Sequence, residues 1–131
     1  MNVFFDENFA DRIPHALEQL DAENHYFHVV DVGWGATKDV AWLSQLPVDE
    51  HNVVFTLDRG ISRNPVERTA WRESGAVIFF LKRSWQDVAP WDVAAKIITR
   101  WEVFLRKAEK ARPGTGFIVP VSGNKIETID L

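Results

Sequence analysis

Two short apolar runs, each ending on an aspartate, constrain the fold of this chain more than any other feature. Val3 to Phe5 is followed by Asp6, and Val53 to Leu57 is followed by Asp58. Runs of this length and apolar character are typical of strands that are covered on both faces in a parallel sheet. Ligands of open α/β sheets bind outside the carboxyl ends of the strands. We therefore expect Asp6 and Asp58 to emerge together at that edge.

The segments around these runs alternate between helical and strand patterns. Apolar residues at helical spacing predict helices over 9–20, 37–46, 64–74 and 91–111. Strands are predicted over 25–30 and 76–81, and a terminal hairpin over 116–121 and 125–131 around a turn at 122–124. This order favours an α/β fold with a central, mainly parallel sheet and a C-terminal β-hairpin.

Single residues mark several of these boundaries. Asn64, Pro65 and Glu67 form a helix start, with Asn as the cap, Pro at the first helical position and Glu three residues after the cap. Gly75 is placed to end that helix. Pro14 must lie in the first turn of its helix or end a preliminary turn, because it lacks the amide that an interior position needs.

Composition limits the classes of protein to which this chain can belong. Its 131 residues suit one domain over 1–131, and 46% hydrophobic residues, with six Trp and nine Phe, can fill a core. Cysteine is absent, which excludes disulfides and Cys-based metal sites. No apolar run approaches the roughly 20 residues of a membrane span, and the N-terminus lacks a secretory signal, so we expect a cytoplasmic protein. The net charge of −4 argues against a general nucleic-acid coat.

Acids follow several predicted strands, and their spacing alone leaves two interpretations open. Asp6, Asp39 and Asp58 could converge as ligands of a hard divalent cation, which relieves the repulsion among neighbouring carboxylates. The same acids could instead cap helices or bind loop amides, and Asp39 also complements a helix dipole in a first turn. Glu7 is a further candidate ligand, and Asp31 is either a ligand or a solvated loop acid.

The order of these motifs resembles the short PIN-like nuclease domains over about the first 82 residues. The resemblance rests on three segments: Phe4 to Asn8, Gly33 to Asp39 before an apolar helix, and Val54 to Arg59. It is closest to the subgroup that opens with Phe-Asp-Glu-Asn, many members of which are presumed toxins of type II toxin–antitoxin pairs. The fold implied is a three-layer sandwich. The loop after Asp58 has Gly60 and Ser62 where the larger family commonly has a further acid, which raises the importance of Glu7.

The resemblance implies a metal-dependent endoribonuclease that hydrolyses phosphodiester bonds of single-stranded RNA with Mg²⁺ or Mn²⁺. It implies that Asp6, Asp39 and Asp58 are catalytic and, with Glu7, bind the metal. Basic residues near the proposed edge could hold the RNA backbone, and Trp34 could stack an unpaired base; these residues are Lys38, Arg59, Arg63 and Lys82. The four histidines show no metal-ligand spacing, and His25 and His28 are expected to be buried and hydrogen-bonded.

Partners and alternatives follow from this interpretation. An RNA substrate and an antitoxin protein are the expected partners, and a homodimer is compatible with the sequence. A phospho-receiver-like regulatory domain also places acids after its first and third strands, but Leu81-Lys82-Arg83 does not supply the hydroxyl residue that it needs after the fourth strand. A PIN-like binding module with a degenerate site is the other alternative.

Overall fold

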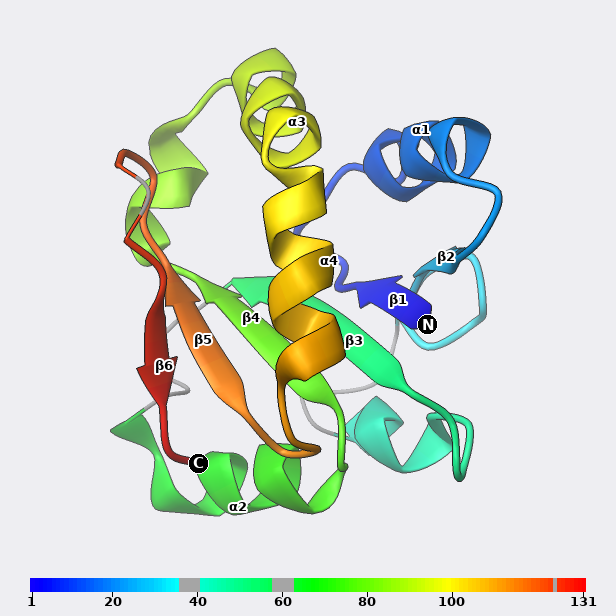
Figure 1. The fold of residues 1–131 in the computed structure, drawn as a ribbon, viewed down its shortest axis with the longest axis vertical. Helices are drawn as coiled ribbons and strands as arrows, with labels where there is room; N and C mark the ends of the chain where they lie inside the picture. Colours follow the sequence, from blue (N-terminus) through cyan, green and yellow to red (C-terminus); the bar gives the residue numbers. More distant parts are fainter. Residues whose placement is uncertain (36–40, 58–62, 124) are drawn as a thin grey trace.

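The computed structural model of this protein describes residues 1–35, 41–57, 63–123 and 125–131. Six strands form one sheet in the order β2-β1-β3-β4-β5-β6 (Figure 1). The bounds of the strands are β1 Asn2–Phe5, β2 His25–His28, β3 Asn52–Leu57, β4 Val77–Leu81, β5 Gly116–Val119 and β6 Glu127–Ile129. All neighbouring pairs are parallel except β5 and β6, which are antiparallel. The predicted α/β fold with a mainly parallel sheet and a C-terminal hairpin is confirmed.

Helices cover both faces of this sheet and complete three layers. Their bounds are α1 Arg12–Leu20, α2 Pro65–Glu73, α3 Pro90–Thr99 and α4 Trp101–Lys110. Figure 1 shows α1, α3 and α4 on one side of the strands, and α2 at the other end of the view with a 3₁₀ helix at Ala41–Gln45. No helix among the described residues is long and apolar enough to cross a membrane.

Alternate side chains of the strands supply two separate apolar cores, as expected for strands buried on both faces. On one face, the rings of Phe5, Phe55 and Phe79 stack in a row, with successive centroids 5.0 and 4.7 Å apart. Phe5 contacts Trp101 of α4, Phe79 contacts Phe104 of the same helix, and Phe55 contacts both. The opposite face has its own buried cluster, which includes Phe4, Val54, Ile78, Phe80, Trp42 and Trp71. The rigid aromatic packing on both sides fixes the positions of the strand ends.

Local sequence signals located several element boundaries correctly. The side chain of Asn64 accepts hydrogen bonds from the amides of Val66 and Glu67 at the start of α2, and Gly75 after that helix has a φ of +72°. Pro14 lies in the first turn of α1, but this helix begins at Arg12 and not at Phe9. Strand β2 ends at His28, so the predicted extension to Val30 was wrong.

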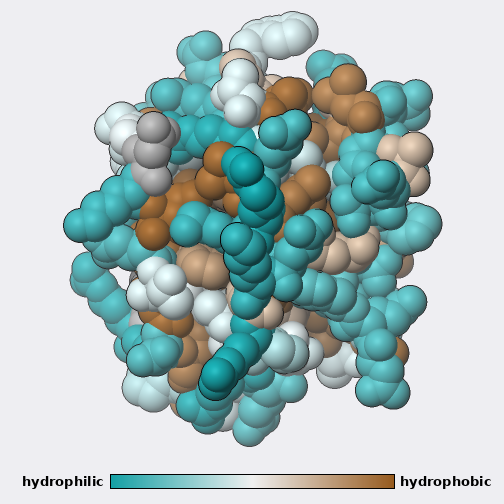
Figure 2. Space-filling view, in the orientation of Figure 1, coloured by the Kyte–Doolittle hydropathy of each residue, from teal (hydrophilic) through white to brown (hydrophobic). Residues whose placement is uncertain are grey.

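The long helix predicted over 91–111 is two helices. Arg100 interrupts it with φ −101° and ψ 4°, and its amide bonds to the carbonyl of Ile97, a spacing tighter than that of an α-helix. The hydroxyl of Thr99 donates to the carbonyl of Ala95 at 2.7 Å, a back-bond that often bends helices. Helix α4 still presents a charged outer surface, which Figure 2 shows as a hydrophilic stripe down the middle of this face.

The remaining differences from the sequence-based expectations concern shorter segments. The helix predicted over 37–46 is a 3₁₀ helix at Ala41–Gln45 in its described part, and residues 36–40 lie outside the description. A second 3₁₀ helix at Arg83–Asp87, which the sequence did not indicate, follows β4. Trp71, Trp85 and Trp101 are buried, whereas Trp91 is 86% exposed.

A hydrogen-bonded network at the amino end of the sheet ties α4 to β2. The indole N–H of Trp101 donates to the hydroxyl of Tyr26 at 2.8 Å, and this hydroxyl donates to Asp21 at 2.5 Å. Asn24 also donates to Asp21 and accepts from the N-terminal ammonium group. Burial and the neighbouring Asp21 carboxylate raise the pKa of Tyr26 well above its ordinary value of 10.0. The phenol is therefore neutral and remains a donor.

We expect Tyr26→Phe to lower the free energy of unfolding by about 1–3 kcal/mol, because it leaves a buried indole N–H without its acceptor. Urea unfolding of Tyr26→Phe, Trp101→Phe and the double variant measures the coupling between the two side chains. A coupling free energy within about 0.3 kcal/mol of zero would show that the pair acts additively and that the hydrogen bond contributes nothing.

Candidate active site

Asp6 is a buried carboxylate at the carboxyl end of β1, which lies between β2 and β3, with 7% of its surface exposed. Its Oδ2 accepts hydrogen bonds from the hydroxyl of Thr56 at 2.5 Å and from the amide of Leu57 at 3.2 Å, both in β3. Its Oδ1 accepts from the amide of Asn8 at 2.9 Å, in the loop that follows β1. The carboxylate thus joins β1, β3 and this loop.

The surroundings of Asp6 act on its pKa in opposite directions. Burial raises the pKa of the carboxyl, because the charged form loses its contact with water. Hydrogen bonds from Thr56, Asn8 and Leu57 favour the charged form and lower the pKa, but burial prevails and the net shift is upward from 3.8. A buried acid of this kind gains from a cation placed beside it, since the cation favours the charged form.

The strand order places Asp6 at a topological switch point, where the order of the strands in the sheet reverses. The chain goes from β1 outward to β2, then crosses back to β3 on the other side of β1 and continues to β4 and β5. Ligands of open α/β sheets bind at such a switch point, in the crevice outside the carboxyl ends of the strands. Asp6, Thr56 and Leu57 meet at this point, between β1 and β3.

Two of the three predicted catalytic acids cannot be placed. Asp39 and Asp58 lie outside the described residues, as do the predicted RNA-binding residues Lys38 and Arg59. Leu57, the last described residue before Asp58, ends β3, and its amide donates to Asp6. The convergence of the three aspartates therefore stays a prediction.

The other predicted site residues lie at the surface or in the core. Glu7, the fourth candidate ligand, is exposed next to Asp6. Lys82 is exposed immediately after β4, and Arg63 is exposed just before α2. Trp34 is partly buried, and its ring stacks against Phe4 and Trp42 at centroid distances of 5.6 and 6.0 Å, which competes with stacking on a base.

A buried histidine supports the loop that contacts Asp6. The Nε2–H of His28 donates to the carbonyl of Phe9 at 2.7 Å, and its Nδ1 accepts from the amide of Val30. These two bonds require the neutral ring with its proton on Nε2. The prediction of a buried, hydrogen-bonded residue is confirmed for His28, whereas His25 is exposed.

A pocket of about 230 Å³ opens beside Asp6 at the carboxyl edge of the sheet. Its walls come from the loop after β1, the last residues of β3 and β4, the 3₁₀ helix at Arg83–Asp87 and the first turn of α3. Asn8, which bonds to Asp6, is one of the lining residues, and Gln86 is another. None of the described lining residues is charged.

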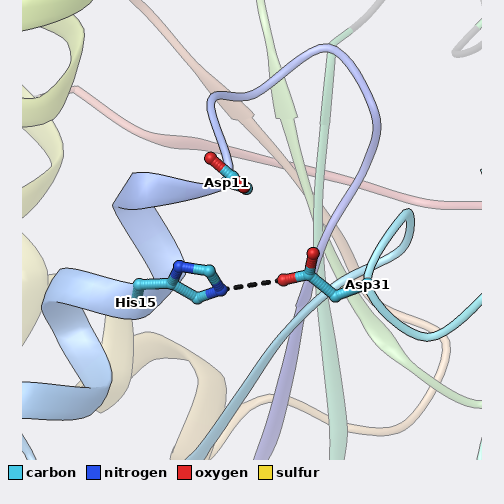
Figure 3. A group of neighbouring side chains, drawn as sticks. All are labelled: Asp11, His15 and Asp31. Atoms are coloured by element: carbon cyan, nitrogen blue, oxygen red, sulfur yellow. Dashed lines mark hydrogen bonds and ion pairs between the residues drawn. The ribbon is translucent and has the colours of Figure 1, made fainter.

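A separate group of side chains, from the start of α1 and from the segment after β2, could hold a metal. Asp11, His15 and Asp31 each offer one ligand atom, and these atoms lie within 4.8 Å of one another (Figure 3). His15 and Asp31 also form an ion pair with an Nε2–Oδ2 distance of 2.8 Å, and all three residues are exposed. The sequence analysis named Asp31 as a candidate ligand but missed Asp11 and His15, because only the fold brings them to Asp31.

The two groups differ in the metals that they suit. Mg²⁺ and Mn²⁺ bind carboxylate oxygens such as those of Asp6. Because burial disfavours the charged form of Asp6, a cation beside it would stabilise that form. The imidazole of His15 suits Zn²⁺ or Ni²⁺ better than Mg²⁺. Exposed groups such as this one are common without an ion. Asp6 is therefore the better position for a hard divalent cation.

Comparisons with known proteins identify the family of the N-terminal region. A family model described as "PIN like domain" matches residues 1–83, which include β1 to β4. No curated protein and no solved structure matches the chain.

The metal-free protein should lose stability, relative to Asp6→Asn, as the pH rises from 3.8 through the raised folded pKa of Asp6. The folded state binds the Asp6 proton more tightly than the unfolded state, so removing that proton costs folding free energy. Urea unfolding in the presence of a chelator, at several pH values, gives the free energy of unfolding of both proteins. Subtracting one from the other cancels the contributions of the other titrating groups. A difference that is flat or that grows in favour of the wild type with pH would contradict the upward shift.

Proposed function

Because this chain belongs to the PIN-like domain family, we propose that it is a metal-dependent endoribonuclease that hydrolyses phosphodiester bonds of single-stranded RNA. PIN-like domains are generally nucleases. The observation that carries the proposal is the buried carboxylate of Asp6 at the switch point of the sheet, where a ligand of this fold is expected.

Asp6 would hold the metal, and its own partners would fix the direction of its carboxylate. The hydroxyl of Thr56 and the amides of Leu57 and Asn8 bind this carboxylate from two strands and a loop, so it cannot rotate freely. Asp39, Asp58 and Glu7 are the further ligands that we propose. A bound Mg²⁺ or Mn²⁺ supplies an activated water and stabilises charge on the phosphoryl oxygens and the leaving group.

Cationic side chains around this edge would hold the RNA backbone. Lys82 follows the end of β4 and is exposed, in the row of strand ends that includes Asp6. Arg63 is also exposed, and we include Lys38, Arg59 and Trp34 in the proposed RNA-binding surface. Contacts to phosphate position an RNA without reading its sequence, so these residues contribute affinity that falls with salt.

The toxin of a toxin–antitoxin pair is the biological role that we propose for this nuclease. It rests on the opening Phe5-Asp6-Glu7-Asn8, which is similar to that of the toxin subgroup. The partner would be an antitoxin protein that covers the proposed metal site at Asp6, and the enzyme would act in the cytoplasm. A small open reading frame beside the gene, whose product suppresses growth arrest caused by this chain, tests the role.

A PIN-like binding module without catalytic activity is a second candidate, and the hydrogen bonds of Asp6 favour it. Both oxygens of this carboxylate already accept hydrogen bonds from protein groups, which is sufficient to explain why an acid is buried there. The family match leaves the receiver-like alternative without support.

We expect Asp6→Asn to lower Mn²⁺-dependent cleavage of single-stranded RNA by more than about 100-fold, because the charge that holds the metal is lost. Asp58→Asn should do the same. His15→Ala is the matched control, since it removes the other candidate metal group and should leave cleavage unchanged. Loss of cleavage in His15→Ala, with activity kept in Asp6→Asn, would move the metal centre to Asp11, His15 and Asp31. Wild-type protein that cleaves no RNA with either metal would favour the binding module.

Mn²⁺ should raise the melting temperature of the wild type by mass action, because the ion binds the folded state. At a concentration 100 times its dissociation constant, the stabilisation amounts to about 2.7 kcal/mol. Asp6→Asn should lose most of this shift, whereas His15→Ala should keep it. An unchanged thermal transition of the wild type at millimolar Mn²⁺ would count against a metal site.

A further inference from the structure

We infer that the pocket beside Asp6 is a subsite for one unpaired nucleobase of the substrate. This inference rests on the proposed nuclease function, which it deepens by assigning a part of the substrate to a part of the protein. The pocket shares the Asn8 loop with the site, and the amide of Asn8 donates to Asp6 at 2.9 Å. A base in the pocket would therefore lie next to the position proposed for the metal.

The lining of the pocket selects against a phosphate and in favour of a neutral, flat group. None of the described lining residues carries a charge, so the described walls offer nothing to balance a phosphate. Leu57, Leu81 and Val93 give apolar walls, and the ring of Trp85 is fixed behind them because its indole N–H donates to the carbonyl of Val119. Apolar surface of this kind suits the faces of a base.

An amide at the rim supplies the polar part of the recognition. Gln86 is exposed and lines the pocket from the 3₁₀ helix that follows β4. A Gln side chain offers one acceptor and two donor hydrogens on one plane. Bases of single-stranded RNA expose donors and acceptors side by side on their edges, so an amide can bond to them in pairs.

The volume of the described pocket suits a single base. Pockets for drug-sized ligands measure roughly 300–1,000 Å³, whereas this pocket has a volume of about 230 Å³. The rest of the nucleotide would remain outside, where Asp6 and the proposed metal act on the phosphodiester. The subsite thus gives the nuclease a preference for the base beside the bond that it cleaves.

Two variants test the subsite in the complete protein. Gln86→Ala removes the amide, and Gln19→Ala removes the same side chain from an exposed position at the end of α1. Ala10→Trp places a large ring at an exposed position that lines the pocket. Its control is Ala22→Trp, at an exposed position in the turn before β2. Circular dichroism and melting temperature verify that all four variants fold.

The first measurement is the binding of adenosine, cytidine, guanosine and uridine to metal-free protein, followed by NMR. At least one nucleoside should bind saturably in the millimolar range. Ala10→Trp should abolish this binding, and Gln86→Ala should weaken it about tenfold, which corresponds to the roughly 1.4 kcal/mol that separates tenfold affinities. Absence of saturable binding for all four nucleosides, or equal binding by both pocket variants and the wild type, would overturn the subsite.

The second measurement is Mn²⁺-dependent cleavage of single-stranded RNA by the same proteins. Ala10→Trp should lower kcat/KM at least tenfold, and Ala22→Trp should match the wild type. Cleavage that is equal in Ala10→Trp and the wild type would overturn the subsite and leave the proposed nuclease intact. Wild-type protein that binds a nucleoside at this pocket but cleaves no RNA would overturn the nuclease and leave the base-binding pocket in place.

Discussion

A buried carboxylate bridges two neighbouring strands of this sheet, since Asp6 at the end of β1 accepts hydrogen bonds from Thr56 and Leu57 of β3. The bridge has two consequences. It closes the carboxyl end of the β1–β3 pair with polar contacts, where the aromatic core on both faces ends. It also keeps a charge-bearing group in a poorly hydrated position, where a cation gains more from a carboxylate than it would in water. Asp6 therefore both links the two strands and serves as the proposed metal ligand.

The parts of the fold that the sequence predicted correctly are those with local causes. The cap at Asn64 and the stop at Gly75 depend on residues that adjoin in the chain, and the apolar runs depend on burial of both strand faces. The break at Arg100 was missed, because the apolar stripe of the predicted helix continues through it. At the junction Thr99 makes a back-bond to the carbonyl of Ala95 and Arg100 leaves helical geometry, and the apolar pattern reports neither.

For the candidate site, the sequence predicted the acid but not its surroundings. A strand that ends on Asp6 is visible as a pattern, and the parallel pairing of β1 and β3 is the arrangement expected for such strands. The partners of Asp6 in β3 are 50 and 51 residues away in the chain, so their contacts require the register of the sheet. The ion pair of His15 and Asp31, and the position of Gln86 beside the Asn8 loop, likewise join residues that are distant in the chain and therefore depend on the fold.

The break at Arg100 gives α3 and α4 different neighbours. Helix α4 supplies Trp101 and Phe104 to the buried core, where substitutions disturb packing. Helix α3 supplies Pro90 and Val93 to the wall of the pocket, at half-exposed and exposed positions. Helix α3 also contributes Ile97 to the core, and Val93 packs against it, so exchange of the exposed Pro90, unlike exchange of Val93, leaves the core packing unaltered. Related chains could in this way acquire different ligand preferences on an unchanged scaffold.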